Sequence, residues 1–304
     1  MVRSFRTALF RLALLAICVW LGDRALGALF DAQLTKSQFR FSVAARGGLP
    51  PILLVLGDSR GVNGLYAPEL EKRTGTRVLN LAYNGMSTLV AEAVLRDYLG
   101  RNDQPRGLVL EVTNVQDNHQ LLDGLMCYWR FGPALSALAD ERSPVNRRAA
   151  RAFHLYAYNG EIPMRALFYA RRSDQDWINR YRISPAVIEE ARATSDFEFG
   201  TQPENLAALG RIVALARERG IALRLIVVPY LPEYMAHARR WDAWLDAVRA
   251  AAGPGARIWD YSSSDRDDSH FADRLHLNDV GGVPFAARLE QDGFLAFDAP
   301  ERRE

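Results

Sequence analysis

The sequence contains little cysteine and almost no lysine. Its two cysteines are Cys18 and Cys127, and neither lies in a CxxC motif or a cysteine–histidine cluster, so nothing indicates a structural zinc site. Cys18 falls inside an apolar stretch, which argues against a disulfide with Cys127. The only lysines are Lys36 and Lys72, so nearly all positive charge is arginine. The formal net charge of +2 leaves no electrostatic footprint for nucleic acid, and we expect no such partner.

Long apolar runs are also scarce, but one lies near the N-terminus. Arg3, Arg6 and Arg11 precede an apolar run at 12–21. The charged pair Asp23–Arg24 interrupts this run, and the stretch 25–30 is again mostly apolar. Such a segment is typical of a signal peptide, with 25–27 as a small-residue cleavage site, or of an uncleaved anchor spanning roughly 8–30. The arginine distribution favours the anchor, with the rest of the chain outside the cytoplasm. A core helix is disfavoured because charge is nearly absent between residues 12 and 22.

The remaining chain alternates short apolar runs with amphipathic segments. Its length of 304 residues, 49% of them hydrophobic, allows one large core or a core with an inserted subdomain. After a predicted linker at 31–50, strands are expected at 52–56, 77–81, 108–112, 221–228 and 256–261. Helices are expected at 68–74, 87–99, 206–220, 241–248 and 284–290. This alternation predicts an α/β domain over 51–304, with a parallel sheet covered by helices on both faces.

Residues 115–205 interrupt the alternation. This stretch is rich in arginine and aromatic residues and carries no clear strand signal. We expect an inserted, largely helical cap. Its aromatic side chains could stack on sugars or could simply form core; they are Tyr128, Trp129, Phe131, Tyr156, Tyr158, Phe168, Tyr169 and Trp177.

Polar residues follow each of the first three predicted strands. The first strand ends in Gly57-Asp58-Ser59-Arg60, the second is followed by Gly85, and the third by Asn114. In parallel sheets the carboxyl ends of neighbouring strands lie along one edge, where functional residues gather. A serine there could be a nucleophile, while a glycine N–H and an asparagine amide could stabilise an oxyanion. Taken singly, each is equally an ordinary turn residue.

A histidine that could activate the serine follows the last strand. Asp273 and His276 are three residues apart, a spacing that can bring both side chains to one side of a turn, and a carboxylate can fix the imidazole tautomer. Asp267 and His270 share this spacing and remain an alternative. We favour His276, because its leucine neighbours can anchor the turn and Asn278 can cap the closing helix.

Together these blocks resemble the SGNH hydrolases, also called GDSL-like esterases, over about 51–114 and 204–290. The resemblance implies a flavodoxin-like three-layer α/β/α fold with a five-stranded parallel sheet and a helical insertion. It assigns Ser59 as nucleophile and first oxyanion donor, Gly85 and Asn114 as further donors, and Asp273 and His276 as the relay. It implies no metal and no cofactor.

The sequence departs from the family pattern at two positions. Arg60 replaces the usual leucine, and it could bind an anionic substrate or form a salt bridge within the fold. The third block usually reads Gly-x-Asn-Asp but is Val112-Thr113-Asn114-Val115 here, so Asn118 is an alternative oxyanion donor.

The N-terminal segment, the Gly-Asp-Ser-Arg turn and the His-Leu-Asn ending are similar to an anchored subgroup of this family. That subgroup works beside membrane-bound O-acyltransferases, as in alginate O-acetylation and teichoic-acid D-alanylation. The resemblance implies an inner-membrane, single-pass protein, or a secreted periplasmic one after cleavage. It would be an extracytoplasmic serine esterase or O-acyltransferase that acts on a cell-envelope glycan through an acyl-serine. A lipase or thioesterase for small esters, and a non-catalytic glycan-binding partner of the acyltransferase, remain alternatives.

Overall fold

The fold is built on one five-stranded sheet in which every pair of neighbouring strands is parallel. The structure is a computed structural model that describes residues 2–297, with side chains from residue 5 onward. The strands lie in the order β2-β1-β3-β5-β7. Along the chain they are β1 (Leu53–Leu56), β2 (Val78–Asn80), β3 (Gly107–Glu111), β5 (Ala222–Val227) and β7 (Ile258–Asp260). This is the flavodoxin-like strand order, so the predicted fold class is confirmed.

Strand β1 forms because its residues are apolar on both faces. In β1 every side chain is buried. Leu54 and Leu56 join one hydrophobic cluster, whereas Leu53 and Val55 join a second cluster on the opposite face. A strand between two dry layers needs this continuous pattern rather than alternation with polar residues.

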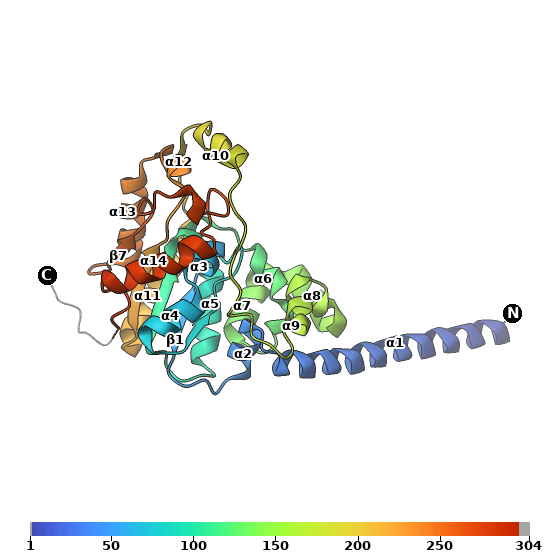
Figure 1. The fold of residues 1–304 in the computed structure, drawn as a ribbon. Coiled ribbons are helices and arrows are strands. Elements are labelled where there is room, and N and C mark those ends of the chain that lie inside the picture. Colours follow the sequence, from blue (N-terminus) through green and yellow to red (C-terminus); the bar gives the residue numbers. More distant parts are fainter. Residues whose placement is uncertain (1, 298–304) are drawn as a thin grey trace.

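Helices cover both faces of the sheet and complete the three layers (Figure 1). The larger cluster includes apolar residues of α5 (Thr88–Leu99), α11 (Pro203–Arg219) and α13 (Trp241–Ala252). The second cluster includes residues of α4 (Ala67–Thr74) and α14 (Asp279–Gln291). Predicted termini hold: the Ser87 side chain accepts from the Val90 N–H at the start of α5, and Gly220 ends α11 at φ 65°. Helix α14 begins directly after Asn278, which caps it as the sequence suggested, so the helix starts before residue 284.

The insertion is largely helical, as expected. It contains α6 (Gln120–Gly124), α7 (Pro133–Arg142), α8 (Pro144–Ala152), α9 (Glu161–Phe168) and α10 (Pro185–Arg192), with 3₁₀ turns η1 (Val112–Gln116), η2 (Met126–Tyr128) and η3 (His154–Tyr158). A small parallel pair of β4 (Phe197–Glu198) and β6 (Ala238–Arg239) was not predicted. Further short elements are α3 (Ser59–Gly64), α12 (Pro232–Met235) and η4 (Asp268–His270). Tyr128 and Trp129 are buried in the core, so these two side chains cannot stack on a sugar at the surface.

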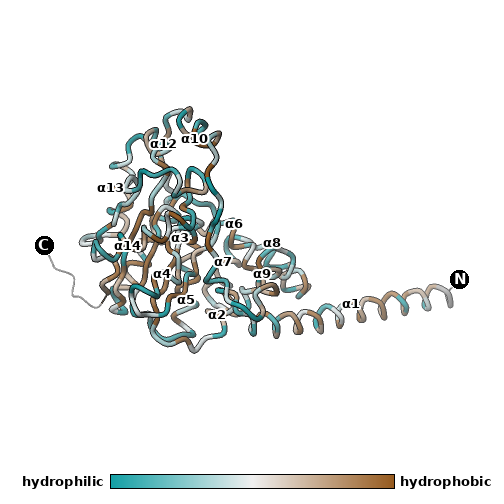
Figure 2. The backbone as a smooth tube through the Cα atoms, in the orientation of Figure 1, coloured by the Kyte–Doolittle hydropathy of each residue, from teal (hydrophilic) through white to brown (hydrophobic). Residues whose placement is uncertain are grey.

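The N-terminal region differs from the expected linker. One helix, α1 (Val2–Lys36), continues beyond residue 30, and α2 (Arg40–Arg46) follows it. Leu34, Phe39 and Phe41 are buried in the main cluster, so residues 31–50 belong to the folded domain. The first part of α1 projects from the domain and carries many apolar side chains (Figure 2).

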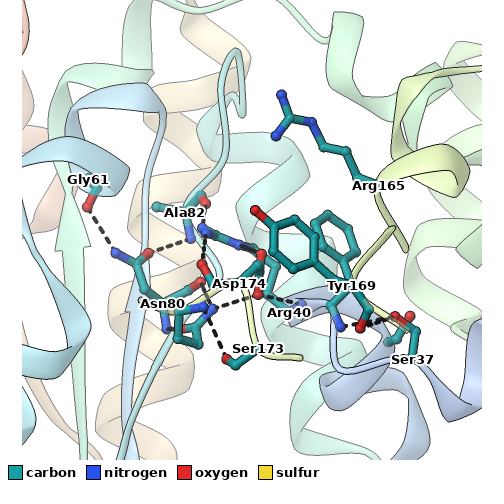
Figure 3. Close-up of polar contacts among 12 residues, drawn as sticks. Ser37, Arg40, Gly61, Asn80, Ala82, Arg165, Tyr169, Ser173 and Asp174 are labelled. Atoms are coloured by element: carbon teal, nitrogen blue, oxygen red, sulfur yellow. Dashed lines mark hydrogen bonds and ion pairs between the residues drawn. The ribbon is translucent and has the colours of Figure 1, made fainter. Parts of the chain in front are cut away.

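A buried arginine fixes this N-terminal region beside the sheet edge (Figure 3). The Arg40 Nε donates to Asp174 Oδ2 at 2.6 Å, and its guanidinium also donates to the Ala82 carbonyl at 2.7 Å. The amide of Asn80, at the end of β2, donates to the Gly61 carbonyl at 3.0 Å. These contacts tie three distant chain segments to the loop that follows β2.

Candidate active site

Ser59 lies at the carboxyl edge of the sheet, as the first residue of α3. The preceding Gly57 has φ 145°, and a Cβ there would lie 2.7 Å from the Glu111 Cβ, so only glycine fits the turn. The Asp58 carboxylate caps α3 by accepting from the Arg60 N–H at 2.8 Å. The turn therefore presents Ser59 at the switch point between β1 and β3, where ligands bind in this fold.

His276 is held in a closed turn between β7 and α14. Phe271 and Leu277 form an isolated antiparallel bridge, and the Ala272 N–H donates to the His276 carbonyl at 2.9 Å. Leu277 is buried, and the Asn278 side chain caps α14 and also donates to the Phe271 carbonyl at 2.8 Å. The burial of Leu277 and the cap formed by Asn278, both suggested by the sequence, thus hold the turn that carries the imidazole.

Ser59, His276 and Asp273 form one hydrogen-bonded chain. The His276 Nε2 lies 2.8 Å from Ser59 Oγ, and its Nδ1 lies 2.9 Å from Asp273 Oδ2. Asp273 Oδ1 also accepts from the backbone N–H groups of Leu275 at 2.7 Å and His276 at 3.0 Å. A nucleophile, a base and an orienting carboxylate in this relation can transfer the hydroxyl proton during attack on a carbonyl.

The environment keeps Asp273 ionised. Partial burial alone would raise its pKa, but the hydrogen bond and positive charge of His276 and the two backbone donors outweigh burial and lower the pKa. An ionised partner favours the imidazole tautomer whose Nε2 can accept the serine proton.

The alternative pair lies elsewhere. His270 Nδ1 is 2.8 Å from Asp265 Oδ2, whereas its Nε2 is 3.6 Å from Asp267. The carboxylate partner is therefore not the Asp267 that the alternative proposed. Both ring nitrogens of His270 face these loop carboxylates, and it is His276 that contacts Ser59.

Of the two further oxyanion donors that were predicted, Gly85 lines the cleft and Asn114 does not within the described residues. Gly85 lines the same cleft as Ser59 and has φ 70°, a conformation that favours glycine. Asn114 is fully buried in η1, and its Oδ1 accepts from the Thr88 hydroxyl at 2.8 Å. Its Nδ2 has no hydrogen-bond partner among the described residues, but Asn114 does not line the cleft within residues 5–297. The exposed Asn118 accepts from the Gln120 N–H instead. The third donor stays a prediction.

Arg60 forms contacts inside the fold, which is one of the two roles that the sequence suggested, and it also lines the cleft over Ser59. Its guanidinium donates to the carbonyls of Leu275, at 2.7 Å, and Val228. The same group lies 3.3 Å from the centroid of the Tyr230 ring, and its Nε is 3.6 Å from the Glu111 carboxylate. The hydrogen bond to Leu275 ties the histidine turn to the serine helix, so Arg60 positions the relay.

We expect Arg60→Met to lower both stability and turnover. Losing buried, charge-assisted hydrogen bonds should reduce the free energy of unfolding by about 2–4 kcal/mol. Because the histidine turn loses a support, kcat should fall while KM changes little. Denaturant titration and ester kinetics check this, with Arg182→Met as control, since Arg182 is half exposed and pairs with Asp279. A raised KM with unchanged kcat and stability would favour the substrate-binding role instead.

Nothing in the sequence indicated the two acidic residues that interact with Asp58. Burial, and then the charge of Asp58, raise the pKa of Glu111 to about 8, although Arg60 and Thr113 oppose the rise. Burial and the charges of Asp58 and Glu111 likewise raise the pKa of Asp117 to about 8. The raised pKa values favour the protonated form of both carboxyls, and protonation of Asp117, which lines the cleft, makes the cleft less negative.

The cleft over Ser59 has a volume of about 280 Å³. An aromatic cluster of Phe197, Phe199, Tyr230 and Tyr234 lines one side, with the Phe197 and Tyr234 rings stacked at 4.5 Å. The end of the insertion, through β4, thus contributes directly to this cleft. The other lining residues are Asp58, Ser59, Arg60, Gly85, Gln116, Asp117, Glu198 and Leu275.

Comparisons with known proteins do not add a family. No protein-family model matches the chain, and a search of curated proteins finds no match. The resemblance to SGNH hydrolases therefore rests on the residues of the four blocks and on their geometry.

Proposed function

We propose that this protein is a serine esterase or O-acyltransferase of the SGNH type. The observation that carries the proposal is the hydrogen-bonded chain from Ser59 through His276 to Asp273, with 2.8 Å between the hydroxyl and the imidazole. The placement of the serine at a sharp strand-to-helix turn, next to glycines with positive φ, supports it further.

The geometry suits a two-step acyl transfer. His276 Nε2 takes the proton of Ser59 as Oγ bonds to the ester carbonyl carbon, and the backbone N–H groups of Ser59 and Gly85 can stabilise the oxyanion. His276 then gives that proton to the departing alkoxide, which leaves an acyl-Ser59. A water or sugar hydroxyl, deprotonated by His276, attacks the acyl carbon, and Ser59 leaves with its proton restored.

A cell-envelope glycan is the proposed acceptor or donor of the acyl group. The aromatic side of the cleft, with the partly exposed Phe197 and Phe199, offers apolar surface beside the nucleophile. The resemblance to the anchored subgroup supports a glycan substrate and a membrane-bound O-acyltransferase as partner. The modest volume of the cleft also suits small acyl esters, which keeps a lipase or thioesterase activity as the second candidate.

Substrate assays separate these two functions. Purified full-length protein should release or transfer acetyl or D-alanyl groups on acylated glycan with a kcat/KM at least tenfold above that for short aryl esters, since remote binding energy lowers the barrier. Ser59→Ala should remove both activities. A higher kcat/KM for the aryl esters would instead favour the small-ester enzyme.

The N-terminal helix supports an anchor. Residues 5–36 form one helix long and apolar enough to cross a membrane, and this is the part of α1 whose side chains are described. We propose a single-pass, uncleaved anchor with the catalytic domain outside the cytoplasm. Cleavage near residues 25–27 would remove Asp23, whose carboxylate binds the backbone of the insertion. The arginines before residue 12 favour a cytoplasmic N-terminus.

A reporter fusion tests this orientation. Alkaline phosphatase fused after Glu304 should be active in an intact bacterial cell, because the enzyme folds only outside the cytoplasm. Fusion to a variant with Leu14 and Leu15 changed to arginine is the control and should lose activity, since charges at the centre of a span oppose insertion. A stable but inactive fusion to the natural sequence would contradict the proposed topology.

A further inference from the structure

The second half of α1 is fixed to the helical insertion. The Asp23 carboxylate accepts from the N–H groups of His154 at 2.7 Å and Leu155 at 2.9 Å. The neighbouring Arg24 donates to the Ala152 carbonyl at 2.8 Å. These bonds cap the first turn of η3 with a side chain of α1, and Asp23 is buried by them.

Further contacts continue along the helix. A Cβ at Gly27 would lie 2.6 Å from the His154 Cβ, so the two backbones approach closely. The Phe30 and Tyr158 rings are 5.2 Å apart, and Asp31 binds both the Tyr158 hydroxyl and the Arg130 guanidinium. From Asp23 onward α1 is therefore a part of the domain and not a flexible tether.

The free part of α1 is too short to hold the domain away from a bilayer. Side chains from residue 5 to residue 21 are exposed, and the apolar run ends two residues before Asp23. The exposed stretch 5–21 spans about 26 Å at 1.5 Å per residue, against a hydrocarbon core of about 30 Å. Arg6 and Arg11 must extend toward the far headgroups. Hence the domain surface around Asp23 must reach the near headgroups.

That surface has the composition of an interfacial region. Phe153 is 53% exposed directly before η3, and Trp20 is 52% exposed with the Arg24 guanidinium 5.4 Å from its ring. Arg148 and Arg151 are exposed on α8, a helix with no buried residue. Figure 1 shows α8 on the side of the domain that faces the free part of α1. We name these five residues the collar.

We propose that the collar rests on the headgroup layer of an anionic phospholipid bilayer, which holds the catalytic domain in one fixed orientation to the membrane. Aromatic rings such as Trp20 and Phe153 favour the boundary between headgroups and hydrocarbon, and arginines are attracted to lipid phosphates. The inference rests on the proposed anchor, and it gives the insertion a role distinct from lining the cleft.

Nitroxide labels on the full-length protein test the collar. Three labelled forms are compared in vesicles of phosphatidylethanolamine and phosphatidylglycerol: native Cys18, and Phe153→Cys or Tyr181→Cys in a Cys18→Ser background. Cys127 is buried and stays unlabelled. Tyr181 serves as the matched control, because it lies on the same insertion and is 79% exposed. It lies two residues after Asn179, whose carbonyl accepts from the Asp279 N–H of α14.

Collisions with a water-soluble nickel chelate report depth. We expect the collision rate at position 153 to be roughly threefold or more below that at position 181, and lowest at Cys18. Arg148→Glu should raise the rate at position 153, because it weakens attraction to the anionic surface.

Two outcomes would overturn the collar and are distinguishable. A protected Cys18 with position 153 as accessible as 181 would reject the collar but keep the anchor. An accessible Cys18 would reject the anchor and the collar together. Fluorophosphonate labelling of the same preparations reports on the catalytic site separately, so a failure of the esterase proposal would not be mistaken for either.

Discussion

Ser59→Ala should abolish covalent labelling by a fluorophosphonate and lower ester turnover by about 10³–10⁶-fold. The Ser59 Oγ lies 2.8 Å from the His276 Nε2, so it is the hydroxyl that the relay can deprotonate. Alanine removes the nucleophile but keeps the backbone N–H proposed as an oxyanion donor. Gel fluorescence after probe treatment, together with steady-state kinetics, measures both effects.

Ser269→Ala is the matched control for this experiment. Ser269 is an exposed hydroxyl in the loop before the histidine turn, and it donates to Asp267 at 2.6 Å. Its loss should leave labelling and turnover close to those of the natural protein. Equal labelling of Ser59→Ala would remove Ser59 from the mechanism. A Ser59→Ala protein that still supports a normal envelope in cells would favour the non-catalytic binding role.

The sheet could be predicted from the sequence because its strands are short apolar runs bounded by clear signals. Parallel strands that are buried on both faces appear as continuous apolar runs in the sequence. Ser87 marks the start of one helix, and Gly75 and Gly220 mark the ends of two others. That residues 31–50 belong to the folded domain could not be predicted, because the burial of Phe39 and Phe41 depends on contacts with the distant insertion. Apolar residues that pack on sequence-remote partners leave no periodic signal.

The contact between Ser59, His276 and Asp273 could be predicted, whereas the surroundings of these residues could not. Ser59 and His276 stand at positions that the topology brings together, directly after strands or before a capped helix. The sequence allowed a salt bridge of Arg60 within the fold but not its partners, since the carbonyls of Val228 and Leu275 that it binds lie far along the chain. Asp117 was also missed: it belongs to a loop, and only the fold brings it into the cleft beside Asp58.

His276→Ala should lower kcat about as severely as loss of Ser59, by about 10³–10⁶-fold, because members of a relay act as a unit. The imidazole bridges the nucleophile and Asp273, so alanine removes the base and leaves the Asp273 carboxylate without its partner. The fold should persist, since the turn is held by backbone bonds and by the buried Leu277. Circular dichroism and thermal unfolding verify folding, and single-turnover kinetics with an aryl ester measure the chemical step.

His270→Ala separates a catalytic role from a merely structural one. His270 lies six residues earlier in the same segment and also contacts a carboxylate, but its partner Asp265 lies in an acidic loop and both its ring nitrogens face that loop. Losing this partly exposed pair should cost about 1 kcal/mol of stability or less and leave most of the turnover. If His270→Ala were inactive while His276→Ala retained activity, the base would be His270, and the contact between His276 and Ser59 would have no catalytic role. A comparable loss in both variants, with both folded, would instead mean that the loop of His270 positions the turn of His276, and Asp265→Asn should then reproduce the effect.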